Sequence, residues 1–344
     1  MAPTSRRSAA EAEVAEDRVI AETIVAPAAA LVAASEHPQH AARRNATVPV
    51  VAQFPLAAIM SFAAASMGYS LMNELTGSEL SAAIRTQDTW AEVGVLATWR
   101  LFELALGWFG NLDSIDVATM DLLSHGPSLY LLSTFYNLSP GTALGALAVN
   151  TVSAAIPFYF FRPLSGAHAS PAVREFVDLP LLVYTTALSS AIYTVTLVLS
   201  LRLFLPRILI LYFDRIASLE PAYDASYAAT LPVTLLLGAA ASAFIFTPFA
   251  ATGKAKEDDR IGEFDPVEAS LSETVWWNFW GYTAKAKVVI RRTAIVMLLT
   301  GVNTYLNCTR TMYGVESKGA LAYALVWVAA AFGTGVSLGL VGGE

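Results

Sequence analysis

The stretch at residues 268–297, EASLSETVWWNFWGYTAKAKVVIRRTAIVM, decides how this 344-residue chain is built. It runs from acidic residues through tryptophans and basic residues into an apolar segment. Indole rings settle at the membrane–water boundary, and Lys and Arg concentrate on the cytoplasmic side of short loops. We therefore interpret one set of side chains as interfacial anchors that face an anionic cytoplasmic leaflet: Trp276, Trp277, Trp280, Lys285, Lys287, Arg291 and Arg292. Residues 270–288 are expected to form one amphipathic helix on that surface, with tryptophans packed onto the protein as the alternative.

The composition supports a membrane protein. Hydrophobic residues make up 55% of the chain and charged residues only 14%, against about 25% charged in soluble domains. The net charge of −7 argues against a nucleic-acid partner. The single cysteine, Cys308, excludes an intrachain disulfide and a cysteine-based zinc site. Phosphate-binding loops, nucleophile elbows and His-Glu-x-x-His helices are missing from the sequence, so we expect no cofactor, no metal and no classical hydrolase activity.

The predicted fold is an all-α, polytopic bundle of about eight transmembrane helices, with six to eight open. Residues 1–47 are expected to form a disordered tail, and residues 48–344 the bundle, with a charged, aromatic-rich segment at 251–292. Two segments are uncertain: 90–110, which spans the membrane or lies at its surface, and 129–136, which is short alone. Eight spans would put both termini on the cytoplasmic side, where most basic residues fall. Six clear spans have enough apolar length: 50–72, 142–161, 181–201, 229–250, 293–309 and 319–341.

A faint internal repeat accompanies these spans. Three short patterns recur in the same order: Pro55 and Pro232 before Ala-Ala-Ala-Ser, Trp90 and Trp277 before Gly, and the pattern Gly-Ala-Leu-Ala at 145–148 and 319–322. A real repeat would place two similar halves around the 181–201 helix. Alanine-rich helices also match by chance, so both interpretations stay open.

Four polar side chains in the spans are candidate pore or bundle positions: Arg100, Glu103, Asn150 and Asn303. Ionisable groups inside a membrane are costly and often functional. Arg100 and Glu103 lie three apart and share a helix face, so a structural ion pair is the alternative. Asparagines in spans also serve as interhelical hydrogen-bonding groups.

The segment 113–125 carries three aspartates, at 113, 116 and 121, and His125. Asp121 and His125 are four apart, so a helix would present both on one face for a metal ion or a proton. The competing interpretation, which we favour at this point, is a solvated acidic loop that ends a helix at His-Gly-Pro. Gly335, Gly339 and Gly343 repeat every four residues, which is typical of close helix packing within the chain or in a homo-oligomer.

The WWNFWGY motif at 276–282, with Arg291-Arg292-Thr293 and the hairpin at 131–147, resembles a group of uncharacterised multi-pass membrane proteins of filamentous fungi. The resemblance covers about residues 50–341. It implies a membrane bundle and transfers no catalytic residue, since no activity is established for that group.

Two functions follow as hypotheses. The first is a small-molecule transporter or channel-like protein, supported by many spans and by polar residues within them. The alternative is a non-catalytic endomembrane protein that organises lipids or partner proteins, supported by the scarcity of buried charge. An intramembrane enzyme ranks third. We expect the protein in the endoplasmic reticulum or the plasma membrane.

Overall fold

The computed structural model describes residues 49–169, 179–253, 258 and 269–342. Every secondary-structure element named within these ranges is a helix, so the all-α prediction holds for the described part of the chain. The tail at 1–47 lies outside the described residues, as does most of 254–268.

Five helices are long and apolar enough to cross a membrane. They are α2 (Val50–Leu75), α6 (Pro140–Phe161), α9 (Leu179–Leu203), the continuous segment Tyr227–Ala251 and α17 (Ser317–Val341). The segment Tyr227–Ala251 consists of α12 (Tyr227–Ala241), a wider turn η1 (Ser242–Phe246) and α13 (Thr247–Ala251). Large apolar side chains such as Val51, Met67 and Leu340 are exposed on these helices, which suits lipid contact. The chain is therefore an integral membrane protein.

Three further helices have spanning length but carry more polar residues. They are α4 (Trp90–Phe109), α5 (Ser114–Phe135) and α16 (Ala284–Leu306), with 20, 22 and 23 residues. None of the three is apolar enough to count as a candidate span, so a count of about eight is not established by composition. The expected span at 293–309 in fact belongs to a helix that begins earlier, at Ala284, and ends in η3 (Asn307–Thr311).

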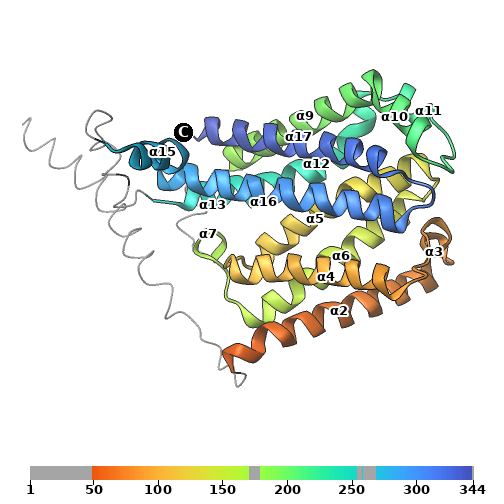
Figure 1. Ribbon diagram of the computed structural model, residues 1–344, viewed down its shortest axis with the longest axis horizontal. Coiled ribbons are helices and arrows are strands. Elements are labelled where there is room, and N and C mark those ends of the chain that lie inside the picture. The colour runs from red at the N-terminus through yellow and green to blue at the C-terminus, as the bar shows by residue number, and fades with distance from the viewer. Residues whose placement is uncertain (1–48, 170–178, 254–257, 259–268, 343–344) are drawn as a thin grey trace, which may run out of the picture.

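The long helices run between two ends of the bundle (Figure 1). We call one the α3 end; it holds α3 (Glu79–Ala83), α10 (Leu205–Tyr212) and α11 (Glu220–Tyr223). The other, the α15 end, holds α7 (Gly166–Ala169), α13 and α15 (Leu271–Trp280). Backbone hydrogen bonds join distant connections at the α3 end, among them Arg85 N–H to the Thr311 carbonyl and Asp214 N–H to the Gly314 carbonyl.

Helix α5 lies at the centre of the bundle. The loop expected at 113–125 is wrong, because Ser114–Phe135 is one continuous helix. Asp113 caps its first turn by accepting from the N–H groups of Ile115 and Asp116. The helix then continues through Gly126 and Pro127. A proline cannot donate to the carbonyl four residues before it, here that of Leu123. Thr300 on α16 donates to that oxygen at 3.3 Å, so the neighbouring helix satisfies the group that the proline leaves unpaired.

Small residues allow the closest helix contacts. A Cβ added at Gly238 on α12 would lie 2.2 Å from the Ser190 hydroxyl on α9, and one at Gly335 on α17 would lie 2.1 Å from the Thr293 hydroxyl on α16. Packing around Tyr323 and Trp327, both fully buried on α17, completes this side of the core. Close approach without side chains is how membrane helices gain dispersion contact.

The amphipathic helix expected at 270–288 is divided in two. α15 ends at Trp280, and α16 begins at Ala284 with the Thr283 side chain accepting from the Ala286 N–H. Gly281 follows the last residue of α15, and a Cβ added there would lie only 2.5 Å from the Trp277 carbonyl oxygen. The chain therefore breaks between the two helices at a residue that has no room for a side chain. The N-terminus of α15 is fixed by a reciprocal capping box between Ser270 and Glu273.

The expected repeat fails at one of its three matches. Trp90 opens the 20-residue helix α4, whereas Trp277 lies inside the 10-residue helix α15. The α5–α6 and α16–α17 hairpins do correspond in order and length. Pro55 and Pro232 also lie at the same position of two candidate spans, Val50–Leu75 and Tyr227–Ala251, so two of the three matches agree with the helices.

Candidate functional site

A cavity of about 440 Å³ lies between α2, α5 and α6 at the α3 end. Ser70 and Ser81 on its wall are exposed, so the cavity reaches the surface. Further inside, its wall carries the polar side chains of Tyr69, His125, Ser128, Asn150 and Asn307. Polar groups on several helices therefore converge on one space inside the bundle.

Behind the inner wall lies a buried ion pair between two helices. Arg100 on α4 donates from Nη1 to Asp121 Oδ1 on α5 at 2.6 Å. The side chain of Arg100 is 14% exposed and that of Asp121 only 3%. A pair this deep in low dielectric interacts strongly, and each charge would be costly without the other.

Arg100 is also held from α6. Its Nη2 donates to the Asn150 carbonyl and to the Ser153 hydroxyl, both at 3.1 Å. The Asn150 side chain in turn accepts from the Tyr69 hydroxyl of α2 at 2.8 Å. Arg100 thus bonds to the backbone of Asn150, whose side chain lines the cavity together with Tyr69.

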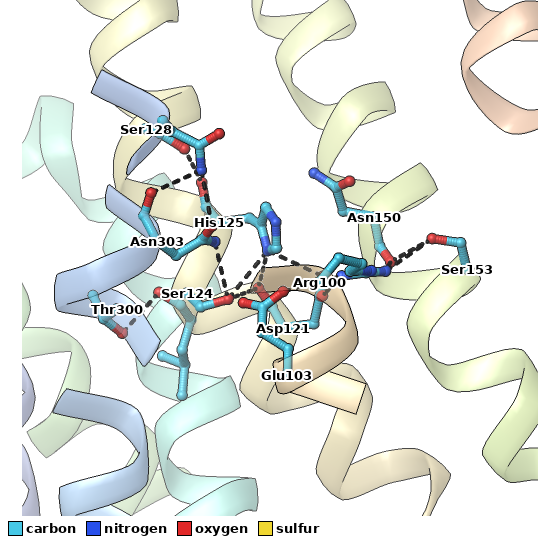
Figure 2. A network of polar contacts seen from close by, with 12 residues as sticks. Arg100, Glu103, Asp121, Ser124, His125, Ser128, Asn150, Ser153, Thr300 and Asn303 are labelled. Carbon is cyan, nitrogen blue, oxygen red and sulfur yellow. Dashed lines mark hydrogen bonds and ion pairs between the residues drawn. The ribbon is translucent and has the colours of Figure 1, made fainter. Parts of the chain in front are cut away.

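Glu103 and His125 complete the cluster. Glu103 Oε2 lies 3.6 Å from Arg100 Nη1, and Asp121 Oδ2 lies 3.4 Å from His125 Nδ1. Glu103 Oε1 and Asp121 Oδ2 are buried and accept no hydrogen bond from the described residues. Figure 2 shows the four side chains meeting beside α5. We call Arg100, Glu103, Asp121 and His125 the α4–α5 cluster.

Asn303 reaches the same region from α16. Its Nδ2 lies 3.4 Å from Ser124 Oγ, and it accepts from Asn307 Nδ2, a cavity residue, at 3.0 Å. In Figure 2, His125 lies between Asn303 on one side and Asn150 on the other. Of the four predicted positions only Asn150 lines the cavity directly; Arg100, Glu103 and Asn303 stand behind its wall.

A second charged cluster lies nearer the α15 end. Arg292 on α16 makes two hydrogen bonds to Asp116, at 2.6 and 3.0 Å, and donates to the Phe244 carbonyl at 2.7 Å. Pro248, four residues after Phe244, has no N–H to donate there, so Arg292 supplies the donor. Arg292, expected among the interfacial anchors, thus places its charge inside the bundle, with only 13% of its side chain exposed.

Asp113 sits at the start of α5 beside α7. Its Oδ2 accepts from the Ser165 N–H at 2.9 Å and contacts His168 Nδ1 at 2.6 Å. Burial opposes the charged form, but the hydrogen bonds from His168, Asp116 and Ser165 prevail and hold the pKa of Asp113 below its usual value. At the opposite end, hydrogen bonds from Thr142 and Ser139 lower the pKa of Glu79. Both carboxylates serve as fixed connections between neighbouring elements.

Among the described residues, two groups have the spacing to hold a metal ion: Glu103 with Asp121 and His125, and Asp113 with Asp116 and His168. In the second group, Asp116 is already taken by a bidentate arginine, and Asp113 by its cap and its histidine. The first group retains two carboxylate oxygens without donors among the described residues. It is the one with free capacity for a cation.

The remaining predicted anchors lie at the α15 end. Trp276 is 67% exposed and Arg291 is exposed, while Trp277, Lys285 and Lys287 are half-buried. Lys285 lies over the Phe249 ring, 5.7 Å from its centroid. The Trp280 side chain lies outside the described residues.

The local sequence favours a loop for Asp121 and His125, and it gives no indication of a role for Tyr69 or Asn307. The spacing of four between Asp121 and His125 was the available signal for a shared helix face. No local sequence pattern marks Tyr69 or Asn307, because the position of each at the cavity depends on which helices meet in the folded protein.

No protein-family model, curated protein or solved structure matches this chain.

Proposed function

We propose that this protein is an eight-span transporter of small polar solutes, which enter the cavity between α2, α5 and α6 from the α3 end. The eight spans are the five apolar helices together with α4, α5 and α16. At 1.5 Å per residue the shortest of the three, with 20 residues, matches a hydrocarbon core of about 30 Å. Arg100 of α4 and Arg292 of α16 are each paired with an aspartate of α5, which reduces the cost of placing these charges in a membrane.

One observation carries the proposal: polar side chains of α2, α5 and α6 line a cavity of about 440 Å³, and a buried ion pair lies behind its inner wall. Small-ligand sites are typically about 300–1,000 Å³, with a few placed polar groups. A purely structural bundle has no need of Tyr69, His125 and Asn150 around an open space, since buried polar groups cost free energy unless they are hydrogen-bonded.

The test has two steps. Ser128→Cys, on the cavity wall, should react with a water-soluble thiol reagent in nanodiscs. The matched control is Ser190→Cys, which faces Gly238 in the α9–α12 contact and should stay unreactive. Native Cys308 is fully buried and gives no background.

The second step measures transport. Amino acids, monosaccharides and carboxylic acids are screened for thermal stabilisation of the purified protein, and stabilising solutes are tested for uptake into proteoliposomes. Ser128→Trp should fill the cavity and abolish uptake, whereas Ser133→Trp, outside this cavity, should not. Uptake no higher than in empty liposomes, or uptake unaffected by Ser128→Trp, would refute the proposal.

The alternative of a lipid-organising protein is favoured by a second cavity. This cavity, of about 490 Å³, lies between α5, α6, α11 and α12 and is lined mostly by apolar side chains such as Leu144, Leu147 and Leu236. An acyl chain is the occupant of matching chemistry. Native mass spectrometry should then detect a retained phospholipid that is lost in Leu147→Trp, with cavity labelling at Ser128→Cys unchanged.

The α15 end supplies the proposed contact with an anionic cytoplasmic leaflet. Trp276 is exposed on α15, and Arg291, Lys285 and Lys287 lie close to it along the chain. Each basic residue near such a surface adds about 1 kcal/mol of attraction. A polarity-sensitive dye on Trp276→Cys should shift to the blue in anionic nanodiscs compared with zwitterionic ones, and high salt should reverse the difference. Equal spectra in both lipids would exclude this contact.

A further inference from the structure

The α4–α5 cluster holds an unbalanced charge. One guanidinium, that of Arg100, faces two carboxylates, those of Glu103 and Asp121. All three side chains are buried, with 14%, 6% and 3% exposed. In the fully ionised state one negative charge would therefore remain without a partner inside the membrane, which is strongly disfavoured.

The other elements around the cluster do not supply the missing charge. Tyr69 from α2, Asn150 and Ser153 from α6, and Asn303 from α16 are polar but neutral. His125, the fourth member of the cluster, is its remaining titratable side chain among the described residues, with Nδ1 3.4 Å from Asp121 Oδ2. The missing positive charge must come from a bound cation or from a proton, which His125 or one of the two carboxylates would hold.

The geometry indicates which carboxylate takes it. Arg100 lies 2.6 Å from Asp121 but 3.6 Å from Glu103, so Asp121 is the carboxylate that the guanidinium compensates. Glu103 is left with an oxygen, Oε1, that is buried and accepts no hydrogen bond from the described residues. Protonation of Glu103 would remove its charge and give one oxygen a hydrogen to donate.

The cavity gives that carboxyl group a route to water. His125 lines the cavity, and one of its ring nitrogens lies within 4.8 Å of carboxylate oxygens of both Glu103 and Asp121. An imidazole takes a proton on one nitrogen and releases one from the other near neutral pH, which makes it a suitable relay. Figure 2 shows His125 beside Asp121 at the centre of the network.

We infer that the Glu103 carboxyl group binds one exchangeable proton, which enters from the cavity through His125, and that this proton is the coupling ion of transport. The coupling rests on the proposed transport function, whereas the proton site does not. The proton passes from water to a His125 ring nitrogen and then to a Glu103 oxygen, and it leaves by the reverse route. No oxidant, reductant or other reactant takes part.

A divalent metal ion fits less well. It would reverse the imbalance and leave one uncompensated positive charge, beside a guanidinium that already repels it. A sodium ion would balance the charge, but the imidazole is a nitrogen ligand, which sodium disfavours. A proton both balances the charge of the cluster and is compatible with the imidazole nitrogen.

The proton site is tested by infrared difference spectroscopy of the full chain in nanodiscs during a pH titration. Wild type should show the carbonyl stretching band of a protonated carboxyl group, and the band should vanish in Glu103→Gln. Glu103→Asp should restore a band at a shifted frequency. The matched control is Glu74→Gln, at an exposed position outside the cavity wall, which should leave the band unchanged.

The relay is tested by the rate of proton exchange after a pH jump. His125→Gln should keep the Glu103 band but slow its appearance. A rate equal to that of wild type would remove His125 from the route and overturn that part of the inference.

Coupling is tested in proteoliposomes that contain a trapped pH dye. Addition of the transported solute should acidify the lumen in wild type but not in Glu103→Gln. A Glu103 band without any solute uptake would refute the proposed transport and leave the proton site standing. Solute uptake without a Glu103-dependent band would refute the proton site and leave the proposed transport standing.

Two results would overturn the proton site itself. One is the absence of any Glu103-dependent carboxyl band across the titration. The other is stoichiometric Zn²⁺ or Na⁺ binding at neutral pH, measured calorimetrically, that is lost in Glu103→Gln.

Discussion

Asp121 on α5 accepts a hydrogen bond from Arg100 on α4 at 2.6 Å, although the two residues are 21 positions apart and belong to separate helices. Direct backbone contact between α4 and α5 is sparse. The charged pair is therefore a main connection between these helices and fixes where α4 lies against the cavity wall.

Breaking this pair should destabilise the protein. Arg100→Met leaves Asp121 buried without its partner, and the usual cost of such a change is about 3–5 kcal/mol. The double variant Arg100→Met/Asp121→Leu removes both charges and should recover most of that loss. Free energies of unfolding in detergent, arranged as a double-mutant cycle, measure the coupling. Equal losses in the single and double variants would show that the pair does not join the helices.

The neighbouring arginines Arg291 and Arg292 offer a matched comparison. Arg292 binds Asp116 through both nitrogens and has only 13% of its side chain exposed, whereas Arg291 is exposed. Lysine keeps the charge but cannot form the planar two-bond contact. We expect Arg292→Lys to lower the unfolding free energy by about 1–3 kcal/mol and Arg291→Lys to change it by less than about 0.5 kcal/mol. Equal effects at both positions would contradict the ion pair.

The contact between Asp113 and His168 predicts a sensitivity to acid. Because the pKa of Asp113 is lower in the folded protein, its contribution to stability is complete above the unfolded pKa, about 3.9. That contribution is lost as the pH falls below this value. The unfolding free energy of wild type should begin to drop as the pH approaches about 4 and continue to drop until the pH passes the lowered pKa of the folded protein.

Two variants isolate the contribution of Asp113. Asp113→Asn retains a good capping residue but removes the titrating group, so its stability should depend less on pH. Asp88→Asn, at an exposed position, should behave like wild type. If Asp113→Asn kept the full acid dependence, other carboxylates would be responsible for it.

The sequence predicted the membrane bundle and most helix positions, because apolar length alone identifies a span. Five of the six clear spans reappear among the apolar helices. The exception, at 293–309, is part of α16, which carries Arg291, Arg292 and Lys287 in its first turns. Local composition could not show that Arg292 is neutralised by Asp116, 176 residues away.

The candidate site was predictable only in part for the same reason. Arg100, Glu103, Asn150 and Asn303 stood out as polar residues in apolar surroundings, and they do lie around one region. Asp121 and His125 were placed in a loop, since Gly126 and Pro127 normally end a helix. The donor that allows α5 to continue, Thr300, lies on another helix and is visible only in three dimensions.

The final prediction concerns the packing of α17 on α16. Gly335 and Gly339 lie one turn apart on the same face, and from the sequence alone both are expected to be close-packing positions. The structure separates them: a Cβ at Gly335 would lie 2.1 Å from the Thr293 hydroxyl, whereas one at Gly339 would lie 3.5 Å from Val289. Gly335→Ala should therefore push the helices apart and cost about 1–3 kcal/mol. Gly339→Ala should fit and gain up to about 1 kcal/mol from helix propensity. Thermal unfolding of both variants in the same detergent provides the measurement.

The double variant Thr293→Ser/Gly335→Ala removes the Thr293 methyl group, one of the clashing groups, and should recover part of the lost stability. If Gly335→Ala were as stable as Gly339→Ala, the close contact between α16 and α17 would be disproved.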